Sequence, residues 1–304
     1  MSTYSVNDYL LDRTNIRDTI PEVLSSVFAD KLVMDYTSLF GGEPIPEPCS
    51  ATGFIGLPAA KALVRAGHTV YGFVRDQAKA KFLAAGESPY LLSPVLMRND
   101  DPDDLQIIPV IGDLDSDVWT KLMPTLDVII EAIGGGEVKD LSATAFERTT
   151  KAVQEMRPKG APLLSHIYTP GTWVHGDSRK DTVIDTTPIY RPVELVTWRP
   201  AMEQAAACSP QINGIVIHPA LLYGRSASIL AMLFKSASQG GRYAVIHADD
   251  LADLYVRAAE KASLIGGKIF DAANPNKEAS RIITLLGLPR RESRQVEFNR
   301  KRES

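Results

Sequence analysis

Residues 51–76, ATGFIGLPAAKALVRAGHTVYGFVRD, decide the fold class of this chain. The stretch opens with a glycine-containing turn, and residues 57–66 then have the Ala/Leu-rich composition of a helix. Gly67 follows in the position where glycine commonly ends a helix. Residues 69–74, TVYGFV, are rich in β-branched and aromatic side chains and predict a short strand. A turn, a helix and a strand in this order predict part of an α/β fold.

The same alternation continues toward the C-terminus. Short apolar runs predict further strands at residues 107–111, 127–133, 162–168 and 214–217. Helical composition recurs at residues 77–85, 143–157 and 192–207. Nearly continuous apolar strands separated by helices indicate a parallel sheet that is covered on both faces. We therefore expect a doubly wound α/β fold.

The composition excludes several other classes of protein. The chain has 304 residues, of which 44% are hydrophobic and 23% charged, as in a folded globular protein. Its net charge of −4 gives no general attraction to nucleic acid or to an anionic membrane. Cys49 and Cys208 are too few for a disulfide scaffold, and five widely spaced histidines predict no metal site. There is no apolar run of membrane-spanning length and no recognisable signal peptide, so we expect a soluble cytoplasmic protein.

The two ends of the chain differ from its central region. We expect an N-terminal extension at residues 1–43, a linker at 44–50, a main domain at 51–288 and a basic tail at 289–304. The tail is interpreted as a solvated terminus rather than a nucleic-acid site, because only Phe298 accompanies its charges.

The linker, PIPEPCS, stands where a first, central strand would be expected. Proline has no backbone N–H for a sheet ladder, so Pro44, Pro46 and Pro48 cannot form a central strand. We expect that strand to be short, missing or supplied by residues 31–39. Residues 9–23 of the extension predict a helix.

The turn at residues 50–56, SATGFIG, lies directly before the first predicted helix of the main domain. Gly53 permits a close approach of the backbone to a ligand, and Gly56 permits close packing of the helix on the sheet. Backbone N–H groups at a helix N-terminus bind phosphates, so this turn is a candidate pyrophosphate site, with an ordinary tight turn as the alternative. The candidate cofactor-binding residues here are Ser50, Thr52, Gly53, Phe54, Ile55 and Gly56.

Arg75 ends the second strand, about 20 residues beyond the turn, where dinucleotide-binding proteins place the residue that reads the adenosine ribose. Arginine there favours the 2′-phosphate of NADP, whereas an acidic residue favours the 2′-hydroxyl of NAD. We expect NADP as the cofactor, with NAD kept open by the neighbouring Asp76. The alternative interpretation of Arg75 is an ordinary surface cation.

Further motifs lie in a fixed order along the chain. They are residues 51–76, the GDL run at 112–114, TPGTWVHG at 169–176, IHPALLYG at 217–224 and IHADDL at 246–251. In this order they resemble extended or atypical short-chain dehydrogenase/reductases of the NAD-dependent epimerase/dehydratase type, over about residues 50–275. The resemblance implies a Rossmann-type sheet with a small C-terminal substrate-binding part and an irregular N-terminal extension. It also implies that Asp113 contacts adenine and that Leu114 and His218 belong to the cofactor site.

The chain departs from this family at the residues that perform the chemistry. The first glycine of the family's turn is Ser50 here. The family's YxxxK pair aligns with Leu195 and Arg199, and leucine cannot donate a proton. Arg199 could still hold a ribose hydroxyl, and it is kept as a catalytic and cofactor-binding candidate.

Other hydroxyl groups lie near the family's catalytic positions. Thr169 and Thr172 are the hydroxyls closest to its Ser/Thr position. Tyr190 lies just before the helix that carries Arg199 and is our candidate substitute proton donor.

The N-terminal extension has a resemblance of its own. The run DRTNIRDTIPEVLSSVFADKLVMDYTSLFGGEP, which starts at Asp12, resembles the start of a SnoaL-like (NTF2-like) domain. Such a domain needs upwards of about a hundred residues to close its sheet, so this fragment is incomplete.

These observations predict an NAD(P)-dependent oxidoreductase or an epimerase/dehydratase-like enzyme that acts on a small carbonyl or alcohol. One alternative is a non-catalytic NADP-binding sensor, and another is a chain that has lost tight cofactor binding. We expect a small-molecule substrate and neither a nucleic-acid nor a membrane partner, and the sequence leaves a homodimer open.

Overall fold

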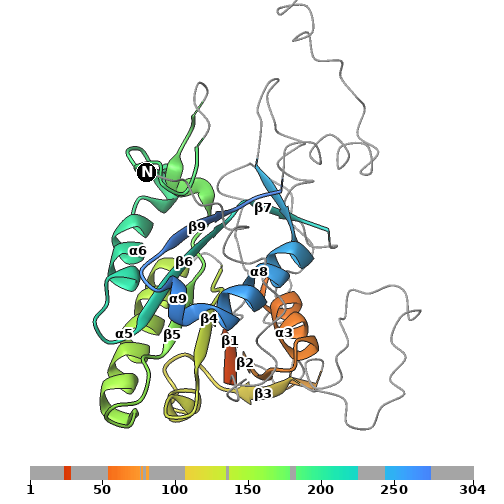
Figure 1. Ribbon diagram of the computed structural model, residues 1–304, viewed down its shortest axis with the longest axis vertical. Helices are drawn as coiled ribbons and strands as arrows, with labels where there is room; N and C mark the ends of the chain where they lie inside the picture. The colour runs from red at the N-terminus through yellow and green to blue at the C-terminus, as the bar shows by residue number, and fades with distance from the viewer. Residues whose placement is uncertain are drawn as a thin grey trace, which may run out of the picture.

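The computed structural model describes residues 24–28, 54–75, 77, 80–81, 107–134, 137–178, 183–224 and 244–274. Within this part of the chain, parallel strands form a seven-stranded sheet in the order β3-β2-β1-β4-β5-β6-β9 (Figure 1). The strands are β1 (Leu24–Phe28), β2 (Thr69–Val74), β3 (Ile108–Ile111), β4 (Val128–Glu131), β5 (Ser165–Tyr168), β6 (Asn213–Pro219) and β9 (Ile269–Ala272). The chain order reverses between β1 and β4, which is the switch point of a doubly wound Rossmann-type sheet. The predicted fold class is therefore confirmed.

The central strand β1 comes from the N-terminal extension. Residues 24–28 pair in parallel with β2 on one side and with β4 on the other. The expectation that the extension supplies this strand is confirmed, but the assignment to residues 31–39 is wrong. Leu24–Phe28, LSSVF, contains no proline and can supply every ladder N–H group that a central position needs.

Helices cover both faces of the sheet. α3 (Gly56–Arg65), α8 (Ala248–Glu260) and the short α9 (Ala262–Ile265) lie on one face, with α3 packed against α8 (Figure 1). α5 (Val138–Met156) and α6 (Arg199–Ala207) lie on the other face. α6 lies very close to β6, because Gly214 has no Cβ to collide with the carbonyl oxygen of Ala206.

The predicted elements mostly agree with the observed ones. The strand predicted at 69–74 is β2, and the other predicted strands differ from β3, β4, β5 and β6 only in their ends. The helix predicted at 192–207 is divided into a single turn, η3 (Glu194–Val196), and α6. Pro200 lies in the first turn of α6, where its missing N–H costs nothing, whereas it would break a helix continuing from residue 192.

Two short strands lie outside the main sheet. β7 (Leu221–Tyr223) and β8 (Val245–His247) pair in parallel, and β8 leads directly into α8. The predicted helix at 9–23, the linker at 44–50, most of the predicted helix at 77–85 and the tail at 289–304 lie outside the described residues. None of the described helices combines the length and the apolar composition needed to cross a membrane.

Candidate functional site

The C-terminal ends of the strands carry the candidate cofactor site. α3 begins at Gly56 beside this edge, and its N-cap residue, Ile55, has no side-chain hydrogen bond to the helix. The first turn of α3 contains no acidic residue. Because a helix N-terminus attracts anions through its free N–H groups and its dipole, this end of α3 suits a pyrophosphate. Phe54, Ile55 and Gly56 lie here, whereas Ser50, Thr52 and Gly53 lie outside the described residues.

Arg75 and Asp113 lie on neighbouring strand ends. Arg75 directly follows β2, and the backbone N–H of Gly112, just after β3, donates a hydrogen bond to the carbonyl oxygen of Val74 at 3.0 Å. Both side chains are exposed. Asp113 sits in a turn closed by Ser116, whose hydroxyl donates to the Asp113 carbonyl oxygen at 2.6 Å. The structure therefore brings together an exposed cation and an exposed carboxylate that sequence analysis assigned to the same ligand.

Leu114 follows Asp113 in the same loop. Its side chain is 7% exposed and packs in the apolar core beneath α5. Its carbonyl oxygen accepts a hydrogen bond from the indole N–H of Trp119 at 3.0 Å. Leu114 thus anchors the loop that carries Asp113, and its place in the cofactor site remains a prediction.

A second set of polar side chains lies under α5 and α6, at the C-terminal ends of β4, β5, β6 and β9. Alternate strand positions place them on this face, opposite the apolar residues that meet α3 and α8. We call this set the buried polar layer. It consists of Glu131, His166, Tyr168, His175, Arg199, Glu203, His218 and Asp271.

Arg199 is held within this layer by acidic neighbours. Burial lowers the pKa of its guanidinium, while Tyr168, Glu203 and Glu131 act in the opposite direction. The guanidinium also lies 5.0 Å from the centre of the Trp198 ring, a cation–π contact. Arg199 therefore neutralises buried carboxylates, and its predicted hold on a ribose remains a prediction.

Tyr168 is a residue that sequence analysis did not select. Its side chain is 1% exposed at the end of β5. Burial raises the pKa of its phenol well above the ordinary value, an effect that the charge of Arg199 opposes and those of Glu131 and Glu203 reinforce. The carboxylate of Glu131 lies beside the imidazole of His166, with 3.2 Å between Oε2 and Nε2.

His218 bridges two carboxylates in the same layer. Its Nδ1 donates to Asp271 Oδ1 at 2.9 Å, and its Nε2 lies 3.2 Å from Glu203 Oε2. Burial by itself would lower the pKa of His218, but hydrogen bonds to Asp271 and Glu203 raise it to about 9. His218 is 1% exposed, so its ring is enclosed by protein, and its place in the cofactor site remains a prediction.

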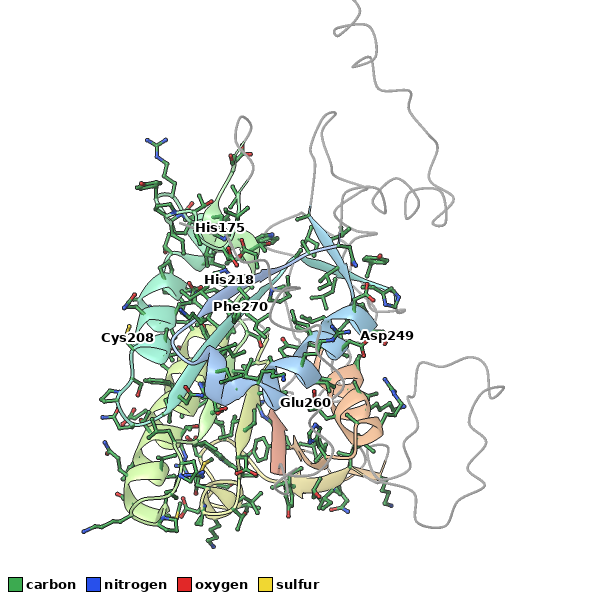
Figure 2. All side chains as sticks on the ribbon, viewed as in Figure 1. His175, Cys208, His218, Asp249, Glu260 and Phe270 are labelled. Atoms are coloured by element: carbon green, nitrogen blue, oxygen red, sulfur yellow. The ribbon has the colours of Figure 1, made fainter. Side chains whose placement is uncertain are left out.

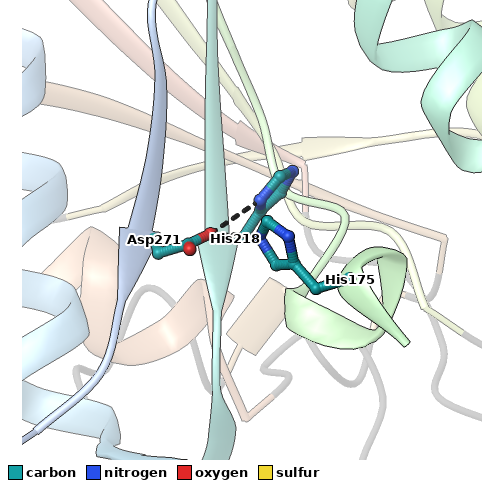
Figure 3. A group of neighbouring side chains, drawn as sticks. All are labelled: His175, His218 and Asp271. Atoms are coloured by element: carbon teal, nitrogen blue, oxygen red, sulfur yellow. Dashed lines mark hydrogen bonds and ion pairs between the residues drawn. The ribbon is translucent and has the colours of Figure 1, made fainter. Parts of the chain in front are cut away.

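His175 reaches the same carboxylate from a different element. It ends the single turn η2 (Thr172–His175), and its Nε2 donates to Asp271 Oδ1 at 3.0 Å. Figure 3 shows Asp271 on β9, His218 on β6 and His175 on η2 converging on one point, and Figure 2 places both histidines in one part of the molecule. Burial would raise the pKa of Asp271, but hydrogen bonds from the two imidazoles lower it to about 2.

The candidate hydroxyl groups are dispersed. Thr169, just after β5, is buried, and its hydroxyl hydrogen bonds to the phenol of Tyr255 on α8 at 2.8 Å. Thr172 begins η2 and is partly buried. Tyr190 is 81% exposed, and Leu195, in η3, is 49% exposed. This exposure argues against Tyr190 as a substitute proton donor, because such a donor has to be packed against substrate and cofactor.

The comparisons with known proteins concern the fold. No protein-family model matches the chain, and no curated protein matches it. The SnoaL-like resemblance of the N-terminal extension therefore has no support from them. Solved structures do match over most of their own length and most of this chain.

Three of these structures illustrate the likeness. One is a putative epimerase from Burkholderia cenocepacia, with a TM-score of 0.57, 18% identity, and coverage of 88% of this chain and 82% of that one. Another is a nucleoside-diphosphate-sugar epimerase from Pseudomonas aeruginosa. Its TM-score is 0.58 and its identity 16%, and the match covers 88% of this chain and 79% of that one. The third is a dTDP-glucose 4,6-dehydratase from Bacillus anthracis in complex with NAD. Its TM-score is 0.59 and its identity 14%, and the match covers 89% of this chain and 83% of that one. At these identities the likeness shows the fold, and the chain thus has the Rossmann-type fold found in epimerases and dehydratases.

Proposed function

We propose that this chain binds NAD(P) and acts as an oxidoreductase or as an epimerase/dehydratase-like enzyme on a small carbonyl or alcohol. The observation that carries the proposal is that Arg75 and Asp113 are both exposed at the ends of the neighbouring strands β2 and β3, while α3, the helix before β2, begins without a side-chain cap. Open α/β sheets bind their ligands at the carboxyl ends of their strands. The complex of a similar fold with NAD supports the class of cofactor.

Each of these residues has a definite part in the proposal. The first N–H groups of α3 would hold the pyrophosphate, Arg75 the 2′-phosphate of NADP, and Asp113 the adenine. Bound nicotinamide supplies or accepts a hydride in such sites. The preference for NADP over NAD rests on Arg75 alone.

The proposed enzyme lacks the family's usual group for proton transfer. The position of the family's tyrosine is occupied by Leu195, and Arg199, at the lysine position, is engaged by Glu131 and Glu203. We therefore expect slow turnover of simple carbonyls. The same two residues favour a second candidate function, a non-catalytic sensor of NADP.

The test compares NADPH oxidation by wild type, Leu195→Tyr and Tyr190→Phe over a panel of aldehydes, ketones and nucleotide sugars. Restoring a phenol at residue 195 is expected to raise turnover, because general acid–base catalysis typically contributes about 10²–10⁴-fold. A loss of turnover in Tyr190→Phe would restore Tyr190 as the proton donor despite its exposure. NADPH binding without turnover in any variant would favour the sensor, and a protein that binds no NAD(P) would overturn both functions.

A further inference from the structure

His175, His218 and Asp271 bring two imidazoles and one carboxylate to a single point (Figure 3). One potential ligand atom from each residue lies within 4.8 Å of the others. Asp271 Oδ1 is 3.0 Å from His175 Nε2 and 2.9 Å from His218 Nδ1. Zinc binds these atom types at about 2.0–2.2 Å in tetrahedral geometry, so two of its ligand atoms lie about 3.3–3.6 Å apart. The two separations to Asp271 are a few tenths of an ångström shorter, as in hydrogen bonds, so a shared ion requires these side chains to move slightly apart.

The surroundings of His218 resemble the support that metal-bound histidines receive. A metal-ligating imidazole usually donates its second N–H to a carboxylate, which fixes the ring and its tautomer. Here Nδ1 is the potential ligand, and Nε2 lies 3.2 Å from Glu203 Oε2. The support is rigid, since His218 and Asp271 face each other across paired strands and Glu203 belongs to α6.

The charges of the buried polar layer favour a cation. Its carboxylates are Glu131, Glu203 and Asp271, and its permanent cation is Arg199. With neutral imidazoles, the layer carries two uncompensated negative charges at low exposure. Buried charges are costly unless paired, and a single divalent cation would balance them. In the metal-free protein, protonated imidazoles are the other means of compensation.

We propose that His175, His218 and Asp271 bind a divalent transition-metal ion of the zinc class. Two imidazoles with one carboxylate favour zinc, cobalt or iron over magnesium and calcium, which prefer oxygen ligands. Three protein ligands leave a coordination position for water or for a substrate oxygen. None of its ligands belongs to β2, β3 or α3, the elements that would hold the pyrophosphate and the adenosine.

The test uses the full chain after treatment with a chelator, titrated with Co²⁺ and followed by the visible absorption of the bound ion. Thermal unfolding with and without Zn²⁺ is a second readout. Wild type is expected to bind about one Co²⁺ per chain and to melt at a higher temperature with Zn²⁺. His175→Ala and Asp271→Asn are expected to lose both effects, while His247→Gln, which alters a histidine on β8, keeps them.

Glu203→Gln sharpens the test, since loss of a supporting carboxylate typically weakens metal affinity about 10–100-fold without abolishing it. Circular dichroism checks that each variant is folded, because only a folded variant that loses Co²⁺ shows that the ion is bound at the altered residue. Absence of a Co²⁺ spectrum in wild type would overturn the proposal and leave a proton-compensated layer. Equal binding by wild type and Asp271→Asn would also overturn it, because the ion would then lie elsewhere.

Discussion

The two halves of the sheet differ in the exposure of their charged side chains. In the nucleotide half, formed by β2, β3 and α3, Arg75 and Asp113 are exposed at the strand ends. In the polar half, formed by β4, β5, β6, β9 and α6, Glu131, Glu203 and His218 are about 1% exposed. Glu203 contacts His218, and Glu131 contacts His166. A charge that remains accessible can meet a ligand, whereas a charge enclosed by counter-charges stabilises the fold or holds an ion. We therefore propose cofactor recognition for the exposed charges of the nucleotide half, and a structural or ion-binding role for the enclosed charges of the polar half.

The largest effect is expected from removing the permanent cation of the polar half. Arg199→Leu removes the guanidinium charge that acts on the buried carboxylates of Glu131 and Glu203, and leaving buried charges uncompensated costs up to about 3–5 kcal/mol. The free energy of unfolding, measured by urea denaturation, should fall by about this amount. Arg65→Leu is the matched control, because Arg65 is exposed at the C-terminal end of α3 and surface changes are usually within about 0.5 kcal/mol.

A double variant tests whether charge is the cause. Glu203→Gln added to Arg199→Leu removes one uncompensated carboxylate and should recover part of the lost stability. If Arg199→Leu were as stable as wild type, the polar half would be solvated rather than buried, and the contrast between the halves would fail.

A smaller effect is expected in the nucleotide half. Arg75→Ala should weaken NADPH binding by about 1.5–3 kcal/mol, the range for a charge-assisted hydrogen bond, and leave NADH binding nearly unchanged. Fluorescence titration of both cofactors measures the difference, with Arg65→Ala as the control. Equal losses for NADPH and NADH would show that Arg75 has a structural role.

Local patterns predicted much of the fold. Residues 69–74 are β-rich and lie between a helix-ending glycine and a charged residue, and they form β2. The GDL run and Thr169 follow apolar runs, so their places at strand ends were predictable from the sequence. Parallel pairing then brings such ends to one edge of the sheet.

The central strand could not be located in the same way. β1, LSSVF, has two serines and follows a run that predicts a helix, so its local signal is weak. Its place depends on pairing with β2 and β4, which begin more than forty residues later in the chain. The prolines of the linker excluded residues 44–50 as the central strand but did not indicate which other residues form it.

The buried polar layer was missed because its members are far apart in the sequence. His175, His218 and Asp271 belong to different elements, and spacing gives no indication that they meet. A signal was nevertheless present: Glu131, His218 and Asp271 are polar residues near the ends of otherwise apolar strands. Such residues need buried partners, so several on neighbouring strands predict a shared site.

The most direct test of the central claim is a titration of the wild-type chain with NADPH and NADH, followed by the fluorescence of the reduced nicotinamide. We predict saturable binding of both nucleotides, with NADPH bound more tightly. The reason is that α3 begins without a side-chain cap, and that Arg75 and Asp113 are exposed at neighbouring strand ends. A folded chain that leaves the fluorescence of both nucleotides unchanged, and that no other binding assay shows to bind them, would contradict it.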